Sequence, residues 1–266
     1  MSDAPGRRWI LVLGASSGFG GASCLAFAEA GYDVLGVHLD RKGTLPLATA
    51  VVEQVRAMGR QCHFFNVNAA DEERREEVLD QVAALLAEHG GTIQVLLHSL
   101  AFGSLVQMAD PEAKHLLQPR QLTMTLEVMA HSLIWWSRDL VQRKLMIRDG
   151  RIFAMTSFGS VVAAPTYGAV SAAKSALESH IRQLAVELGR HGVRANSIMA
   201  GVTDTPALRK IPDHEHMLSE ASRRNPSGRI TTPEDVAAAL VDLARPGLHW
   251  MTGNVIRIDG GEGVVA

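Results

Sequence analysis

The sequence is poor in cysteine, in aromatic residues and in net charge. Its 266 residues include two cysteines, 5% aromatic residues and a formal net charge of −2. Cys24 and Cys62 lack CxxC or zinc-like spacing, which predicts two reduced, buried thiols. A charged fraction of 20% excludes a disordered polyelectrolyte, and the balanced charge leaves no electrostatic footprint for nucleic acid. We therefore expect a globular protein with no nucleic-acid partner.

Long apolar segments are also missing. No run approaches the ~18 apolar residues that a membrane helix needs, so no membrane association is expected. The first apolar run, residues 9–13, ends at Gly14 and lacks a cleavage-site pattern, which indicates a strand and not a signal peptide. These absences favour a cytoplasmic protein, and the length permits one or two domains.

Short apolar runs alternate with longer segments of helical periodicity along the chain. The expected strands are residues 10–13, 34–37, 61–65, 95–98, 151–156, 194–198 and 255–258. The expected helices are residues 18–30, 45–58, 70–88, 122–143, 164–190 and 233–243. This alternation predicts an α/β fold with a doubly wound, Rossmann-like parallel sheet of about seven strands and helices on both faces. No linker interrupts it, which favours a single domain over residues 1–266.

Residues 201–225 stand apart because their periodicity is weak. They contain two prolines together with His214 and His216. We expect a mobile segment that covers the substrate at the carboxyl edge of the sheet, where ligands bind in this architecture. The two histidines have no third ligand nearby in sequence, so no metal site is predicted.

A glycine-rich turn follows the first predicted strand and leads directly into the first predicted helix. Glycines at this point let the backbone approach a pyrophosphate, and the free N–H groups and dipole of the helix favour the anion. The turn predicts a dinucleotide site, and its residues are Gly14, Ser16, Ser17, Gly18, Phe19 and Gly20.

The Gly-x3-Gly-x-Gly spacing of this turn resembles that of the short-chain dehydrogenase/reductase superfamily. Further landmarks of the resemblance are Asn66-Val67, Ser157, a Tyr…Lys pair, Thr203-Asp-Thr205 and Asp259-Gly-Gly261. The resemblance implies that Asn66 and Val67 flank the adenine of a dinucleotide. It also implies that Thr203 and Thr205 lie beside the nicotinamide.

The chain has two tyrosines, and one of them is a candidate proton donor. Tyr32 lies in a short loop before a predicted strand and is interpreted as structural. Tyr167 precedes Lys174 by seven residues, about two helical turns, so both side chains are expected on one helix face. A lysine there can hold the cofactor ribose and lower the pKa of the phenol, which makes Tyr167 a usable acid near neutral pH.

The spacing between Tyr167 and Lys174 resembles that of one branch of the superfamily. Most superfamily members carry Tyr-x3-Lys, but position 170 is valine here. The Tyr-x6-Lys spacing resembles the enoyl-acyl carrier protein reductases. So does the segment after the fourth predicted strand, which the resemblance places beside the cofactor through Ser99, Leu100 and Ala101. From Thr203 onward the chain resembles the NADPH-preferring type III form.

Two positions depart from the family patterns. Ser157 stands where the type I enzymes carry a second tyrosine and where ordinary reductases keep their catalytic serine. It is kept as a third catalytic candidate that can donate a hydrogen bond to the substrate. Met129 replaces the asparagine of the ordinary catalytic tetrad, which weakens a ketoreductase interpretation.

The end of the second predicted strand bears on cofactor choice. Sites selective for NAD usually have an acid there, but this chain has His38. Arg41, Lys42 or a protonated His38 would suit a 2′-phosphate, which favours NADPH. Asp40 lies two residues after His38, and it would favour NADH instead if it occupied the position of the usual acid.

The leading hypothesis is an NADPH-dependent trans-2-enoyl thioester reductase of fatty acid synthesis, acting on coenzyme A or acyl carrier protein thioesters. One alternative is a ketone or aldehyde reductase of the same superfamily. Another is a non-catalytic dinucleotide sensor, but a sensor does not need the proton donor that Tyr167 and Lys174 provide. The resemblance also implies a homotetramer through residues 122–143, which include Trp135 and Trp136, and residues 164–190.

Overall fold

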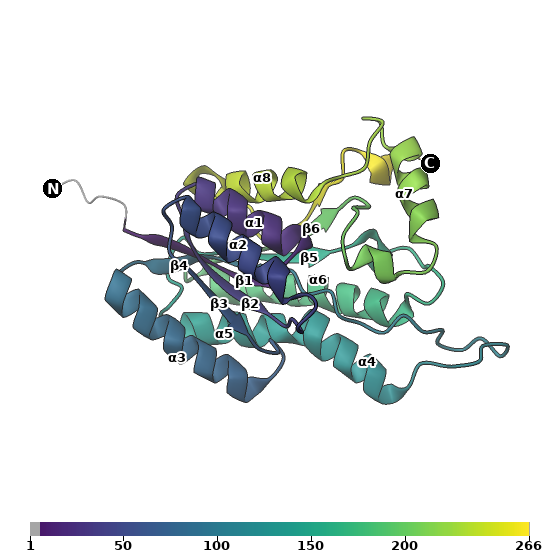
Figure 1. Ribbon diagram of the computed structural model, residues 1–266, viewed down its shortest axis with the longest axis horizontal. Coiled ribbons are helices and arrows are strands. Elements are labelled where there is room, and N and C mark those ends of the chain that lie inside the picture. Colours follow the sequence, from purple (N-terminus) through teal and green to yellow (C-terminus); the bar gives the residue numbers. More distant parts are fainter. Residues whose placement is uncertain (1–5, 266) are drawn as a thin grey trace.

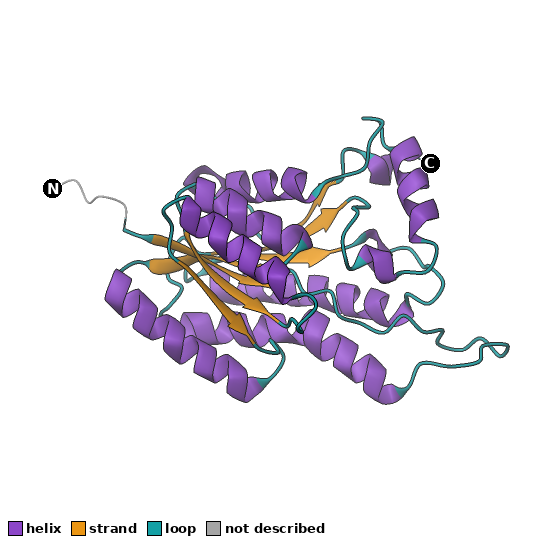
Figure 2. Ribbon diagram, viewed as in Figure 1, coloured by secondary structure: helices purple, strands orange, loops and turns teal. Residues whose placement is uncertain are grey.

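The computed structural model describes residues 6–265, whose strands form one parallel seven-stranded sheet (Figures 1 and 2). The strands are β1 (Arg8–Leu13), β2 (Asp33–His38), β3 (Cys62–Asn66), β4 (Thr92–His98), β5 (Arg151–Thr156), β6 (Arg194–Ala200) and β7 (Val255–Ile258). Their order is β3-β2-β1-β4-β5-β6-β7, which confirms the doubly wound prediction. The order reverses between β1 and β4, and open α/β sheets bind ligands outside the carboxyl ends of the strands at this switch point.

Helices cover both faces of the sheet (Figure 1). One face packs against α1 (Gly18–Glu29), α2 (Leu45–Ala57) and α8 (Pro233–Leu243). The other packs against α3 (Glu72–His89), α4 (Pro119–Leu126), α5 (Ser132–Gln142) and α6 (Gly168–Gly189). The central strands are apolar on both sides because both faces are buried. In β1, for example, Leu11 and Leu13 enter one core, whereas Ile10 and Val12 enter the other.

Two expectations about the helices were wrong. Residues 122–143 do not form one regular helix, because a π-turn over Glu127–His131 separates α4 from α5. No helix is expected in residues 201–225, but they contain a 3₁₀ turn and α7 (His214–Arg224) at the carboxyl edge of the sheet (Figure 1). Within α7 only Ala221 is buried, so the apolar periodicity that reveals most helices is absent. His214 and His216, two residues apart on this helix, do not share a face.

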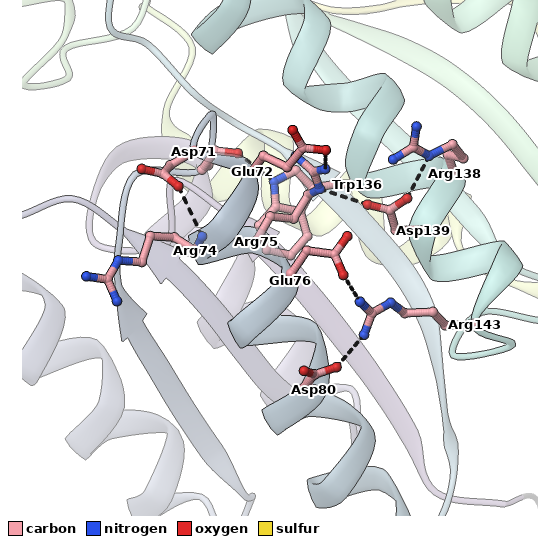
Figure 3. Close-up of polar contacts among 11 residues, drawn as sticks. Asp71, Glu72, Arg74, Arg75, Glu76, Asp80, Trp136, Arg138, Asp139 and Arg143 are labelled. Carbon is pink, nitrogen blue, oxygen red and sulfur yellow. Dashed lines mark hydrogen bonds and ion pairs between the residues drawn. The ribbon is translucent and has the colours of Figure 1, made fainter.

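A buried polar network joins α3 to α5 (Figure 3). The side chain of Arg75 is 2% exposed, and its Nε donates to Asp139 Oδ2 at 2.8 Å. The other oxygen of Asp139 accepts from Arg138 Nε at 2.7 Å, and Trp136 Nε1 donates to the Ala69 carbonyl at 2.8 Å. Each buried group therefore has a partner, as burial of charge requires.

This network corrects the expectation for the tryptophan pair. Trp136 is completely buried within the chain and cannot contribute to a contact between subunits. Trp135 is only partly buried, and the Arg138 guanidinium lies 5.1 Å from its ring centroid. Of the two, only Trp135 can reach a neighbouring subunit.

Three other expectations concern buried side chains and helix length. Cys24 and Cys62 are buried free thiols, as predicted. Tyr32 is structural, as predicted, because its ring packs edge-on against Phe27 with the centroids 5.0 Å apart. Over the described residues, no helix has the length and apolarity needed to cross a membrane.

Candidate active site

The glycine turn has the geometry that a bound pyrophosphate requires. Gly14 and Gly18 have φ values of 90° and 55°, which favour glycine. A side chain on Gly14 would collide with the Ser99 carbonyl, and one on Gly20 would collide with the Gly14 carbonyl. Ser17 caps α1 without a side-chain hydrogen bond, so the first N–H groups of the helix remain available to an anion. These residues fit a dinucleotide phosphate group.

The segments that follow β4 and β6 both contact this turn. Ser99 N donates to the Leu13 carbonyl at 2.8 Å, which brings Leu100 and Ala101 alongside the turn. A methyl group on Gly18 would lie 3.5 Å from Thr205 Cγ2. The hydroxyl of Thr205 accepts from Leu208 N at 3.2 Å, and these contacts place Thr205 beside the start of α1.

Thr203 lies in the segment after β6, and Phe19 lies in the first turn of α1. The Thr203 hydroxyl donates to the Gly201 carbonyl at 2.9 Å, which fixes the segment after β6. Phe19 packs against the core on the α1 side of the sheet. Of the two threonines that the resemblance places beside the nicotinamide, Thr205 is brought against the glycine turn.

The end of β2 is arranged differently from the prediction. His38 is 5% exposed, and its Nδ1 lies 2.8 Å from Asp40 Oδ2, so the imidazole is not free to meet a phosphate. Burial raises the pKa of Asp40, but hydrogen bonds from Thr44, Ser16 and His38 outweigh that effect and hold the pKa below its usual value. The Asp40 carboxylate therefore stays charged at the end of β2.

Asn66 and Arg41 complete this corner of the site. Both ends of the Asn66 amide bond the Asp40 backbone at 3.0 Å, so the amide braces this loop and is not free for adenine. Val67 N likewise donates to the His38 carbonyl at 2.8 Å. Arg41 and Lys42 are exposed, and neither forms an ion pair with any residue in 6–265.

Tyr167 and Ser157 are in direct contact. Tyr167 caps α6, and its hydroxyl lies 3.2 Å from Ser157 Oγ, just beyond the end of β5. A side chain on Gly159 would overlap the Tyr167 ring, and one on Gly168 would overlap Met108. The sequence pattern did not single out Gly159 or Met108, because their contacts with the tyrosine segment depend on the folded loops.

The pKa shifts of Tyr167 and Lys174 differ from the sequence prediction. Burial raises the pKa of Tyr167, and the hydrogen bond with Ser157 lowers it in part. Lys174 is not among the groups that lower the phenol pKa in this arrangement, and its Nζ donates to the Met155 carbonyl at 2.7 Å. Burial lowers the pKa of Lys174 itself to about 8, although the Glu178 carboxylate opposes this shift. The lysine is therefore close to its titration point near neutral pH.

A buried polar layer lies behind Lys174. Glu178 Oε1 accepts from Thr156 Oγ1 at 2.6 Å, which ties α6 to the end of β5. His98, the last residue of β4, is completely buried, and its Nε2 lies 2.9 Å from Ser132 Oγ. The sequence pattern does not reveal these contacts, because only Glu178, one helical turn after Lys174, lies near the lysine in sequence.

Comparison with known proteins agrees with this geometry. Residues 14–262 match the sequence model of the family described as enoyl-(acyl carrier protein) reductase. The chain belongs to this family. It is accordingly an oxidoreductase of the short-chain dehydrogenase/reductase type with a nicotinamide dinucleotide-binding fold.

Relatives within this group differ in substrate and cofactor. The 1-cyclohexenylcarbonyl-CoA reductase of Streptomyces collinus is 28% identical over 262 residues, which cover 98% of this chain and 88% of the relative. The NADH-dependent enoyl-[acyl-carrier-protein] reductase FabI of Aquifex aeolicus is 28% identical over 186 residues, covering 70% and 68%. A short-chain dehydrogenase of Burkholderia cenocepacia, solved in complex with NADP, has a TM-score of 0.80 at 25% identity and covers 96% and 97%.

Proposed function

We propose that the protein is an NADPH-dependent reductase of trans-2-enoyl thioesters. The observation that carries the proposal is the position of Tyr167 at the start of α6, seven residues before the buried Lys174. Val170, at the position of the tyrosine in Tyr-x3-Lys enzymes, is buried and has no proton to donate. Tyr167 is thus the phenol available to a substrate at this edge of the sheet.

The reaction requires a proton donor beside the thioester oxygen, and these residues provide it. The bound cofactor would supply a hydride to the β-carbon of the substrate. Negative charge then develops on the thioester oxygen, and the Tyr167 hydroxyl donates the proton that neutralises it. Lys174 holds the cofactor ribose and restores the proton of Tyr167. Ser157, 3.2 Å from the phenol, orients its hydroxyl.

The preference for NADPH rests on the loop after β2. Arg41 and Lys42 are exposed cations at this corner and suit a 2′-phosphate. The Asp40 carboxylate lies 2.8 Å from His38 Nδ1 and stays charged, which works against a 2′-phosphate, so the proposed preference depends on Arg41 and Lys42. The relatives include an NADH enzyme and an NADP complex, so this loop supports the choice more directly than similarity does.

A second candidate function is reduction of a ketone or aldehyde. The contact between Ser157 and Tyr167 supports it, because two hydroxyl groups side by side can donate to one carbonyl oxygen. Both candidates require a proton donor and a cofactor, so only the substrate distinguishes them.

The test compares matched substrates with NADPH and with NADH. Crotonyl-CoA and the same acyl group on acyl carrier protein report enoyl reduction, and acetoacetyl-CoA reports ketone reduction. We expect crotonyl thioesters to oxidise NADPH and acetoacetyl-CoA to leave it unchanged. The reverse pattern would establish the ketone reductase and overturn the proposal.

We also propose a homotetramer that associates through α4, α5 and α6. Trp135 on α5 and the exposed Val186 on α6 supply apolar surface for this contact. Light scattering measures the assembly directly. A monomer at working concentration would contradict it.

A further inference from the structure

His98 lies on the same side of the sheet as Lys174. It is the last residue of β4 and pairs in register with Ala154 of β5. The next residue of β5, Met155, provides the carbonyl that accepts from Lys174 Nζ at 2.7 Å. Ser132 of α5 covers the histidine from the helical side. The imidazole is thus enclosed by β4, β5, α5 and α6, with no exposed surface.

The hydrogen bonds around Ser132 determine the tautomer of His98. Ser132 Oγ lies 2.8 Å from the Val128 carbonyl, which can only accept, so the serine proton is donated there. The same oxygen lies 2.9 Å from His98 Nε2 and must accept at that contact. Nε2 therefore carries the hydrogen, and Nδ1 of the neutral ring keeps a lone pair.

This lone pair lacks a partner in the structure. Nδ1 is buried, and no atom of residues 6–265 lies within hydrogen-bonding distance and angle of it. Burial and the nearby Lys174 charge lower the pKa of His98 to about 3, although a contact with the backbone of His98 opposes them in part, so the ring stays neutral at physiological pH. Buried acceptors without partners are uncommon in folded proteins and cluster where groups move or react.

We propose that His98 is a positioning residue for Lys174, whose ammonium alternates between the Met155 carbonyl and the Nδ1 lone pair. The lysine has three N–H donors, and the Met155 carbonyl accepts from one of them. The lone pair offers a second acceptor from β4 when the ammonium turns toward the cofactor ribose and Tyr167. The inference rests on the proposed role of Lys174, not on the identity of the thioester.

The π-turn between α4 and α5 supports this arrangement. It contains Val128, whose carbonyl receives the Ser132 proton and so fixes the histidine tautomer. π-turns within helices often occur at functional sites.

The titratable groups around Lys174 are His98 from β4 and Glu178 from α6, whereas β5 and α5 contribute the neutral Thr156 and Ser132.

Nitrogen NMR of ¹⁵N-histidine protein without cofactor tests the tautomer independently of activity. A His98→Gln spectrum identifies the His98 signals among the eleven histidines. We expect Nε2 to be protonated and Nδ1 unprotonated across the neutral range, and Ser132→Ala to give a mixture of tautomers. Ser132→Thr, which keeps the hydroxyl, should restore the original pattern. A protonated Nδ1 in the unaltered protein would overturn the proposal.

The pH profile of kcat tests the link to Lys174. In Ser132→Ala the ring can turn an N–H toward the ammonium, which lowers the lysine pKa and moves the alkaline limb to lower pH. If the lysine pKa falls by about one unit, we expect kcat at pH 8 to fall about fivefold, because the ammonium fraction drops from about one half to about one tenth, with KM nearly unchanged. Ser132→Thr should return the limb to its place, and an unmoved limb in Ser132→Ala would refute the inference.

A separate readout distinguishes failure of this inference from failure of the proposed function. If no thioester is reduced, the proposed function is wrong, but Lys174 still contacts the cofactor. The pH dependence of the NADPH dissociation constant then replaces kcat. The same displacement is expected in Ser132→Ala, and its absence would again refute the role of His98.

Discussion

The α3–α5 network and the polar layer around Lys174 are both buried, but they differ in how fully their groups are paired. In the network, Arg75 and Arg138 occupy both oxygens of Asp139 (Figure 3). Near the site, the Lys174 ammonium bonds one carbonyl, and His98 Nδ1 bonds no described residue. The network holds two helices together, whereas the site retains donors and acceptors for a substrate and a cofactor.

This difference separates structural from functional polar groups in the chain. A saturated buried pair contributes to stability only while both partners remain. A group with spare bonding capacity can change partners during a reaction, at some cost to stability. Substitutions in the network should therefore change the free energy of unfolding, and substitutions at the site should change rates.

The largest expected effect is on stability and comes from Asp139→Leu. The leucine branches as aspartate does, but it is larger and uncharged. It leaves the buried Arg75 with only the exposed Glu72, 3.6 Å away, as a counter-charge, so unfolding should become easier by about 3–5 kcal/mol. Urea denaturation measures this change. Arg143→Ala is the matched control on the same helices, because its ion pairs with Asp80 and Glu76 are more exposed and should contribute under about 1 kcal/mol. Equal losses in both variants would show that the buried pair contributes no more to stability than the exposed ones.

Tyr167→Phe should lower the reaction rate and leave the stability nearly unchanged. Loss of the proton donor should lower kcat by about 10²–10³, with cofactor affinity and the unfolding free energy nearly unchanged. Tyr32→Phe is the control, since that phenol lies in the core on the α1 side of the sheet. A kcat for Tyr167→Phe close to that of the unaltered enzyme would remove this residue from the chemistry.

The lysine should impose a pH limit on the reaction. Its pKa of about 8 means that the ammonium form is lost as the pH rises through that value. We expect kcat to be level below pH 8 and to fall about tenfold per unit well above it. Lys174→Ala should damage both the rate and cofactor affinity. A kcat that stays constant to pH 10 would show that this proton is not needed.

Arg41→Ala tests the cofactor corner. Removal of a charge-assisted contact should weaken NADPH binding about tenfold and leave NADH binding nearly unchanged. Titration of each cofactor against the variant and the unaltered protein provides the comparison. Equal affinities for the two cofactors in the unaltered protein would contradict the NADPH preference.

Ser157→Ala should have the smallest effect of the five. Its hydroxyl shares one hydrogen bond with Tyr167, so kcat should fall about fivefold, as expected for one neutral hydrogen bond. The pH profile should keep its alkaline limb, because Lys174 is untouched. A loss as large as that of Tyr167→Phe would favour the ketone reductase instead.

The sequence predicts the strands of the sheet and the glycine turn well. The strands were found from local apolar runs, and the glycine turn from residues within seven positions of one another. Tyr167 and Lys174 were found because seven residues separate them, and both lie at the site. Each of these signals is local in sequence, which is why no tertiary information was needed.

The partly satisfied groups could not be predicted in the same way. The bond between His98 and Ser132 spans 34 residues, and that between Thr156 and Glu178 spans 22. The pKa of Tyr167 depends on burial, and a spacing rule says nothing of burial. His38 was expected to meet a phosphate, but its pairing with Asp40 depends on the turn of the loop after β2. These features arise only when distant segments pack together.

The assignment of the proton donor is tested most directly by single-turnover rates with crotonyl-CoA and saturating NADPH. The unaltered enzyme, Tyr167→Phe and Ser157→Ala are mixed with substrate under identical conditions. We predict that Tyr167→Phe is slower than the unaltered enzyme by about 10²–10³ and that Ser157→Ala is only about fivefold slower. Tyr167→Phe at the unaltered rate with an inactive Ser157→Ala would contradict the account.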